Sequence, residues 1–257
     1  MKEEFLKTVF KKHQLAEPIP SMGAVCKFAD RLLQTLFPPL SEMKFSSVKD
    51  LEIHLLTLER ELYTVLDGLK KQLNDSPENL AGRYMKQLPL IYDHLEKDVQ
   101  AIVLGDPAAK TELEVILTYP GFYAIAMYRI AHALHLLEIP YLPRVITEYA
   151  HSKTGIDIHP GANIEPYFCI DHGTGVVIGE TTIIGKYVKI YQGVTLGALS
   201  VAKEMASVKR HPTIEDNVVI YSGATILGGD TVIGENSIIG GNVWITKSIP
   251  PHSTVYH

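Results

Sequence analysis

The sequence is poor in cysteine and lacks both long apolar runs and a strong excess of one charge. Only two cysteines, Cys26 and Cys169, occur in 257 residues, and they lie in different segments. This excludes a disulfide-dense secreted scaffold and a zinc site built from cysteines. We therefore expect a protein of the reducing cytoplasm.

Membrane proteins and nucleic-acid-binding proteins are disfavoured as well. No apolar run reaches the roughly 18 residues that a membrane helix needs, and the N-terminal MKEEFLKTVFKK is too charged for a signal peptide. The formal net charge is -5, from 24 basic and 29 acidic residues, which offers no basic surface to nucleic acid or to a membrane. The apolar content of 46% indicates a globular chain.

Leucine becomes scarce and glycine frequent after about residue 153. Only three leucines, but 14 of the 19 glycines, lie beyond that point. Leucine with little glycine favours helices, whereas isoleucine and valine with frequent glycine favour short strands and tight turns. We expect a helical domain over residues 1–152 and a β-rich domain over residues 153–257.

Apolar residues of the first half recur at helical spacing. One stripe covers residues 51–69 and a second covers 90–103. A third helical stretch, 113–137, should be broken or kinked at Pro120. A shorter helix is expected after Pro140. Taken alone, these stripes indicate packing in a core or between subunits.

A six-residue repeat of aliphatic side chains organises the second half. The repeat positions are Ile158, Ile164 and Ile170, then, after a shift of two residues, Ile178, Ile184, Ile190 and Leu196, and later Tyr221, Leu227, Ile233, Ile239 and Ile245. This period fits neither a helix face nor simple strand alternation. It predicts a parallel β-solenoid with three flat sides and inward aliphatics. Residues 197–213 interrupt the period and should project as a loop.

Several motifs resemble those of one enzyme family. The repeat is similar to that of the left-handed β-helix acyltransferases. Within this group, several strings resemble the serine O-acetyltransferase branch. They are DIHPG (157–161), IDHGTGVVIGET (170–181), QGVTLG (192–197), RHP (210–212), GDPA (105–108) and GFYAIAMYRIAH (121–132). The resemblance covers about residues 80–251. It implies an α+β protein in which an α-helical oligomerisation domain precedes a left-handed parallel β-helix of hexapeptide repeats.

The resemblance implies that acetyl-CoA is the co-substrate and that its acetyl group moves to the hydroxyl of L-serine, for cysteine biosynthesis. His172 would be the general base, because the pKa of an imidazole lies near neutral pH. It stands where the repeat shifts by two residues, and such a break can aim a side chain outward. Asp157 would orient and polarise His172, as the carboxylate does in hydrolytic triads.

Four more residues match the family's serine site. Asp106 and Asp171 would hold the ammonium group, although Asp106 before Pro107 is also a common helix start. Arg210 would bind the carboxylate, to which a planar guanidinium is well matched. His211 would also contact serine. A loop anchored by a surface cation is the alternative for both Arg210 and His211.

Coenzyme A would run along the coil, between two subunits. The matching positions are Gly197, Ala198, Ser222, Gly223, Gly240 and Gly241, with Lys247 at a phosphate. Turn geometry alone could also explain these glycines. No metal is expected, because His159, two residues after Asp157, has no third His or Cys at ligand spacing.

The resemblance also implies a homotrimer in which His172 of one chain lies near His211 of the next. The helical domain would join two trimers into a hexamer, and the sequence leaves trimer or hexamer open. Cysteine is the feedback inhibitor that the family implies. The chain departs from the family at Ala198, where Gly is usual, and in a longer loop over 199–209. It also ends without the family's tail, so we expect no tail-mediated complex with O-acetylserine sulfhydrylase.

Three other functions remain to be separated by experiment. Another hexapeptide acyltransferase would use a different acceptor, such as homoserine or a sugar. A γ-type carbonic anhydrase has the same coil but needs three His ligands per site, and His172 and His211 have no such companion. A non-catalytic scaffold would not need the Asp157, His172, Arg210 and His211 set.

Overall fold

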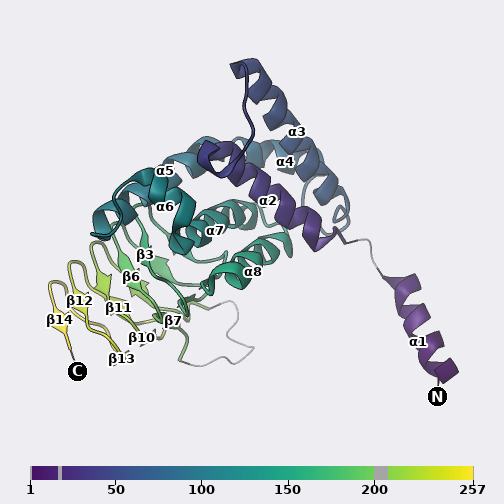
Figure 1. Cartoon of the computed structure of the whole chain (residues 1–257). Coiled ribbons are helices and arrows are strands. Elements are labelled where there is room, and N and C mark those ends of the chain that lie inside the picture. The colour runs from purple at the N-terminus through teal and green to yellow at the C-terminus, as the bar shows by residue number, and fades with distance from the viewer. Residues whose placement is uncertain (1, 17–18, 200–207, 257) are drawn as a thin grey trace.

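A computed structural model describes residues 2–16, 19–199 and 208–256. Helices form the N-terminal part and a β-solenoid of about five turns forms the C-terminal part (Figure 1). The coil is a left-handed β-helix, so the expected fold class is confirmed. Among the described helices, none combines the length and the apolarity that a bilayer crossing requires.

Eight α-helices precede the coil within the described residues. Their bounds are α1 Lys2–Leu15, α2 Met22–Leu36, α3 Val48–Asp67, α4 Pro77–Met85, α5 Leu88–Gly105, α6 Glu112–Thr118, α7 Pro120–Leu136 and α8 Leu142–Thr154, with a 3-10 turn at Pro38–Leu40. The side chains of Ser21, Ser47, Ser76 and Thr111 cap α2, α3, α4 and α6 by accepting a backbone N–H. The expected break at Pro120 is confirmed, because α6 ends before it and α7 begins there.

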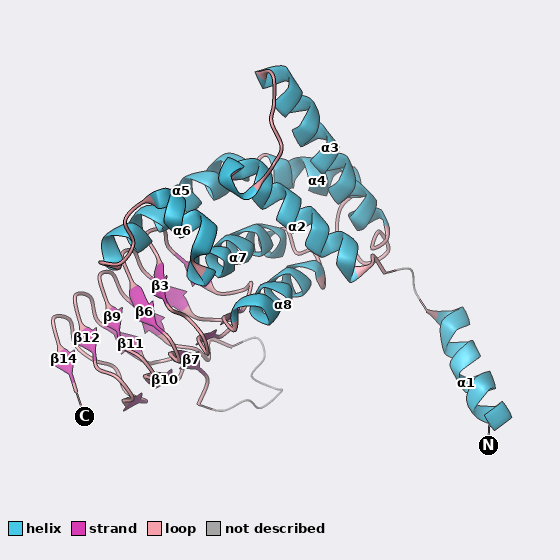
Figure 2. Ribbon diagram, viewed as in Figure 1, coloured by secondary structure: helices cyan, strands magenta, loops and turns pink. Residues whose placement is uncertain are grey.

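The helices differ in how they are used. The apolar stripes of the sequence did not predict α1, α2 and α4. Helix α1 has no buried residue and stands apart from the other helices (Figure 1). Helices α5, α7 and α8 lie on the coil, where α5 and α7 both contact β3 (Figure 2). Gly121 permits the close approach of α7, because a Cβ there would overlap the Ile170 carbonyl oxygen.

The coil has three parallel sheets, one on each side. The first sheet contains β1 Asp157–Ile158, β4 Val177–Ile178, β7 Thr195–Gly197, β10 Thr225–Leu227 and β13 Trp244–Ile245. The second contains β2 Asn163–Ile164, β5 Ile183–Ile184, β8 Thr213–Ile214 and β11 Val232–Ile233. The third contains β3 Cys169–Asp171, β6 Lys189–Tyr191, β9 Val219–Ile220, β12 Ile238–Ile239 and β14 Thr254–Val255.

The repeat positions up to Leu196 are buried as expected, and so are the later Ile233, Ile239 and Ile245. The two predicted positions directly after the loop, Tyr221 and Leu227, are wrong. Ile220 and Ile226 are the buried residues there, whereas Tyr221 is exposed and Leu227 only partly buried. Ile226 pairs with Leu196 in the neighbouring turn. The corner after β10 takes one extra residue, which shifts the phase of the later repeat by one position.

The predicted loop leaves the coil after β7 and returns at β8. Residues 200–207 of this loop lie outside the described residues, so its projection stays a prediction. Helix α8 ends at Thr154 and β1 begins at Asp157. The buried apolar residues of helices and coil form one continuous cluster, and the proposed division after residue 152 stays a prediction.

A buried ion pair joins the helices to the coil. Arg129 of α7 binds both carboxylate oxygens of Asp98 in α5 and donates to the carbonyl oxygens of Ile164 and Glu165, at 3.0 and 3.2 Å. Asp98 also accepts the backbone N–H of Phe168, at 2.9 Å. The two side chains are 5% and 0% exposed.

We predict that Arg129→Met strongly destabilises the fold, because it leaves Asp98 buried without a counter-ion. The expected loss is about 3–5 kcal/mol in the free energy of unfolding, measured by urea denaturation. Lys97→Met is the matched control, because Lys97 pairs with Asp93 at the surface of the same helix and should cost about 0–1 kcal/mol. Equal losses in the two variants would contradict this account.

Candidate active site

His172 projects from a break in the coil. A regular turn of the coil has 18 residues, as from Ile178 to its partner Leu196. The preceding turn, from Ile158 to Ile178, has 20 residues, and the two extra residues follow β3. His172 adopts a left-handed conformation with φ 57°, and its side chain is 75% exposed. The preceding Asp171 is buried. The expected outward orientation of His172 at the break is therefore observed.

Asp171 lies next to His172, and Lys189, Asp106 and Tyr119 are connected to this pair by contacts or by charge. Asp171 Oδ1 lies 3.9 Å from His172 Nε2, and Asp171 Oδ2 lies 2.8 Å from Lys189 Nζ. Asp106 follows the end of α5 and accepts a hydrogen bond from the Tyr119 hydroxyl at 2.7 Å. This hydrogen bond and that from the Ala108 backbone lower the pKa of Asp106 below its usual value, and the nearby charge of Lys189 lowers it further. The structure thus brings Asp106, Asp171 and His172 together.

The interpretation of Asp106 as a helix start is wrong. No helix begins at Pro107 among the described residues; α5 ends at Gly105 and α6 begins at Glu112. Asp106 Oδ1 instead accepts the backbone N–H of Ala108 at 2.8 Å, which closes a side-chain turn. The turn and the Tyr119 hydroxyl hold the carboxylate next to the coil.

A second group gathers around His211. Its Nδ1 accepts the Thr181 backbone N–H at 3.1 Å and lies 2.9 Å from the Thr181 hydroxyl. Burial lowers the pKa of His211 to about 4, so the ring is neutral near pH 7 and Nε2 carries its hydrogen. The ring lies over Gly179, where a Cβ would overlap it. His211 is thereby fixed as a neutral hydrogen-bond donor.

Arg210 belongs to the same group. Its guanidinium pairs with Glu180, and its backbone N–H donates to the Thr181 hydroxyl at 2.9 Å. Burial opposes ionisation of Glu180, but the hydrogen bond and charge of Arg210, together with the neighbouring His159 and His135, outweigh it and lower the pKa of Glu180. A carboxylate ligand of Arg210 would therefore share the guanidinium with Glu180.

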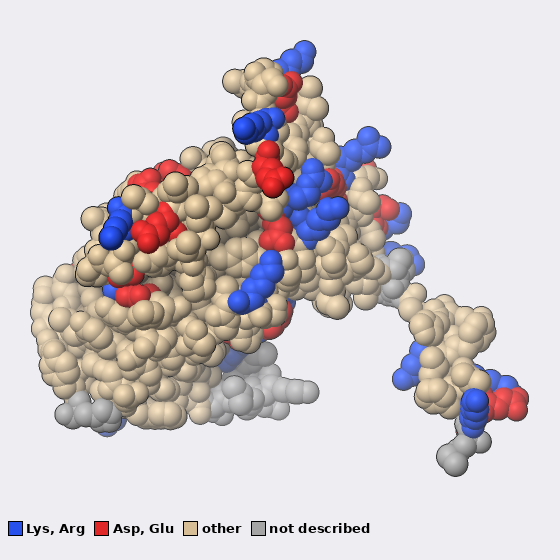
Figure 3. Space-filling model, in the orientation of Figure 1, with Lys and Arg blue, Asp and Glu red and all other residues tan. Residues whose placement is uncertain are grey.

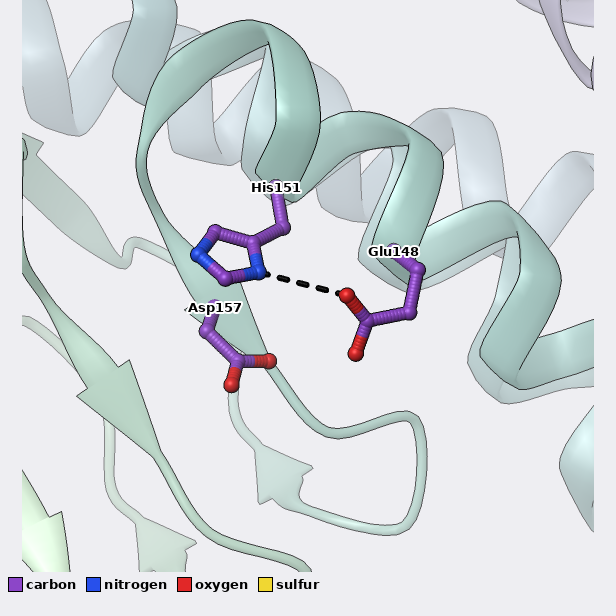
Figure 4. Close-up of side chains that lie close together, drawn as sticks. All are labelled: Glu148, His151 and Asp157. Carbon is purple, nitrogen blue, oxygen red and sulfur yellow. Dashed lines mark hydrogen bonds and ion pairs between the residues drawn. The ribbon is translucent and has the colours of Figure 1, made fainter.

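Asp157 faces α8. It accepts a hydrogen bond from Arg144 at 3.0 Å, and Arg144 also pairs with Glu148. Figure 4 shows Asp157 beside Glu148 and His151, whose Nδ1 lies 3.3 Å from Glu148 Oε2. These three side chains are close enough together to share a metal ion, but Arg144 already supplies a positive charge to both carboxylates.

Within the described residues, no hydrogen bond or ion pair joins Asp157 to His172. The role of Asp157 as the group that orients His172 stays a prediction.

The predicted coenzyme residues border the first sheet on its two edges. Ser222, Gly223, Gly240 and Gly241 lie at the corner between the third and first sheets, and Gly197, Ala198 and Lys247 lie at the corner between the first and second. At the former corner Gly223 donates to Gln192 O at 2.9 Å and lies on Gly193 of the turn below. His172 occupies this same corner two turns earlier. The roles of these residues stay predictions.

The groups around His172 and around His211 lie at different corners of one chain. His172 is between the third and first sheets, whereas Arg210 and His211 lie beside the corner between the first and second. Among the described residues, no hydrogen bond or ion pair connects the two groups. Each chain therefore carries two separate sets of candidate site residues.

Sequence reasoning missed the partners of these residues. Lys189 follows Cys169 by one 20-residue turn and is its partner in the ladder, a spacing that the repeat already contained. Thr181 and Glu180 stand inside the quoted IDHGTGVVIGET string. Nothing local pointed to Tyr119, because the fold alone brings it to Asp106.

Comparisons with known proteins agree with this geometry. No protein-family model matches the chain. The plasmid serine acetyltransferase of Synechococcus elongatus is 52% identical over 188 residues, which are 71% of this chain and 59% of that protein. The serine acetyltransferase of Bacillus pumilus is 45% identical over 166 residues, 65% of this chain and 74% of that protein. For four curated relatives the chain spans between 48% and 59% of their length.

Solved structures extend the similarity to most of the chain. Serine acetyltransferase 1 of Entamoeba histolytica in complex with L-cysteine has a TM-score of 0.81 and 38% identity, covering 89% of this chain and 86% of its own. The Neisseria gonorrhoeae enzyme in complex with serine has a TM-score of 0.64 and 28% identity, covering 95% and 85%. A serine acetyltransferase in complex with CoA has a TM-score of 0.61 and 29% identity, covering 91% and 94%. The chain therefore belongs to the serine acetyltransferase family.

Proposed function

We propose that this protein transfers the acetyl group of acetyl-CoA to the hydroxyl of L-serine, giving O-acetyl-L-serine for cysteine biosynthesis in the cytoplasm. The observation that carries the proposal is the exposed His172 imidazole, raised on a break of the coil beside Asp106 and Asp171. The serine and CoA complexes of family members support both substrates.

The chemistry is a direct attack. His172 takes the hydroxyl proton while the serine oxygen attacks the thioester carbonyl, which forms a tetrahedral intermediate. The intermediate collapses, the carbon–sulfur bond breaks, and the imidazolium returns the proton to the coenzyme A sulfur. Asp106 and Asp171 hold the serine ammonium, and Asp157 orients His172. The coenzyme arm runs past Ser222–Gly223, Gly240–Gly241 and Gly197–Ala198, with Lys247 near a phosphate.

We further propose that the working site forms between two chains of a homotrimer. The separation of the His172 group from the His211 group supports this, because both would be needed for one serine. Arg210 of one chain then binds the serine carboxylate and His211 donates through Nε2. Figure 3 shows few charged side chains on the visible face of the coil, which suits packing against another chain. Residues 1–152 would join two trimers into a hexamer.

His172→Ala should lower serine-dependent release of free thiol from acetyl-CoA by about 10²–10⁴-fold, because the proton acceptor is lost. Steady-state rates with serine, with homoserine and without acceptor are the measurement. His13→Ala is the matched control, since His13 is exposed on α1, and it should behave as the unaltered protein. Homoserine reacting faster than serine would assign a different acceptor.

A mixing experiment tests the site between chains. His172→Ala and His211→Ala are each expected to be nearly inactive. An intact site needs His172 from one chain and His211 from its neighbour. In trimers assembled at random from equal amounts of the two variants, about a quarter of the sites meet this condition, so about a quarter of the normal activity should return. No recovery in co-assembled trimers would place the whole site within one chain.

Cysteine should inhibit by competing with serine, because it has the same ammonium and carboxylate groups; the L-cysteine complex of a family member supports this. Initial rates should show a raised KM for serine at unchanged kcat. Arg210→Gln should weaken both serine and cysteine by about 10-fold or more, since a charged hydrogen bond is lost. Rates that stay unchanged with cysteine in large excess over serine would contradict competition.

A further inference from the structure

Lys189 joins three parts of the molecule beneath His172. Its Nζ lies 2.8 Å from Asp171 Oδ2 and donates to the Gly105 carbonyl oxygen, at the end of α5, at 2.6 Å. It also lies 4.3 Å from the centroid of the Tyr191 ring. The Lys189 side chain is 13% exposed and the Asp171 side chain 9%. A lysine so enclosed holds one fixed position.

The contacts of Asp171 link Lys189 to His172. One carboxylate oxygen binds Lys189, and the other lies 3.9 Å from His172 Nε2. The carboxylate therefore stands between an ammonium group and the candidate base. Burial works against the charge of Lys189, but its hydrogen bonds to Asp171 and Tyr191 outweigh this and raise its pKa, so Lys189 is charged at neutral pH.

Six titratable groups surround this point from four elements. They are Asp171 and Cys169 of β3, Lys189 and Tyr191 of β6, Asp106 after α5 and Tyr119 before α7. Burial raises the pKa of Cys169 to about 12, and the hydrogen bond to Asp106 raises the pKa of Tyr119 to about 12. Both are neutral near pH 7, which leaves two carboxylates and one ammonium group to set the local charge.

We propose that Lys189 is a positioning residue: its ammonium group holds Asp171 in place and balances its charge, so that His172 accepts the serine proton beside a compensated carboxylate. An uncompensated carboxylate 3.9 Å from Nε2 would stabilise the imidazolium form instead. The contact with Gly105 gives Lys189 a second effect, since it fixes the end of α5 from which Asp106 reaches the site.

With Lys189 present, the two carboxylates and the ammonium group sum to one negative charge. That charge matches the single ammonium group of serine. The inference rests on the proposed function for its kinetic consequences, but the protonation of His172 can be measured without turnover.

The test compares Lys189→Met with Lys189→Arg, Lys189→Met/Asp171→Asn and Lys186→Met. Met keeps the length of the side chain without its charge, and Arg keeps the charge. The double variant removes both charges of the buried pair, so the buried charge stays balanced. It is included in case Lys189→Met alone fails to fold. Lys186 is the matched control, because it is exposed at the corner before β6, in the same turn of the coil as Lys189 but away from the corner that carries His172.

Two readouts are needed. The first is the pH profile of kcat/KM for serine. The second is the pH dependence of His172 modification by diethyl pyrocarbonate, which acylates only the unprotonated ring, followed by peptide mass spectrometry. For Lys189→Met, the acid limb of the profile and the modification midpoint should both rise by about one pH unit. Lys189→Arg and Lys186→Met should stay near the unaltered protein in both readouts. The double variant should keep only the modification midpoint, because Asp171→Asn also removes a contact of the serine ammonium.

The outcomes separate this inference from the proposed function. A shifted modification midpoint in a protein that never acetylates serine would keep the role of Lys189 and reject the activity. A folded Lys189→Met protein with an unshifted midpoint would overturn the role of Lys189, whether or not serine is acetylated. An equal shift in Lys189→Arg or Lys186→Met would also overturn it, because the effect would not then come from the charge at Lys189.

Discussion

The buried pair of Arg129 and Asp98 is the interaction on which the rest of the structure depends. Arg129 donates to two backbone carbonyl oxygens of the first coil turn, while Asp98 accepts a backbone N–H from the same turn. A coil of stacked turns leaves unpaired peptide groups at its first turn. This pair, together with Tyr128 donating to Ala162 O at 2.6 Å, satisfies several of them and fixes α5 and α7 on the coil.

The position of α5 then decides the active site. The helix carries Asp98 in its middle and leads directly into Asp106, so the contact that anchors the helix also sets where that carboxylate lies. Lys189 secures the same helix end from the coil side. The helical part is therefore a component of the candidate site, beyond any role in assembly, because one of its residues stands beside Asp171 and His172.

The coil contributes chemistry where its regularity fails. Regular turns hide their aliphatics and present short strands, which hold few reactive groups. The two extra residues after β3 turn His172 outward, and the long insertion before β8 delivers Arg210 and His211. Each irregularity costs some stacking, but the turns above and below remain paired and hold the displaced residues in place.

The sequence determined the coil, its core-facing aliphatics before the loop, the break at Pro120 and the candidate residues His172, Asp106 and Asp171, because spacing and short motifs are local properties. It could not give the register of the turn directly after the loop, because one extra residue at the corner after β10 shifts the phase between Ile226 and Ile233. It also could not give the roles of Lys189, Tyr119 and Thr181. Only the tertiary structure decided these, since their partners come from other turns or from α5, and charge compensation between buried groups depends on distances that the chain order does not encode.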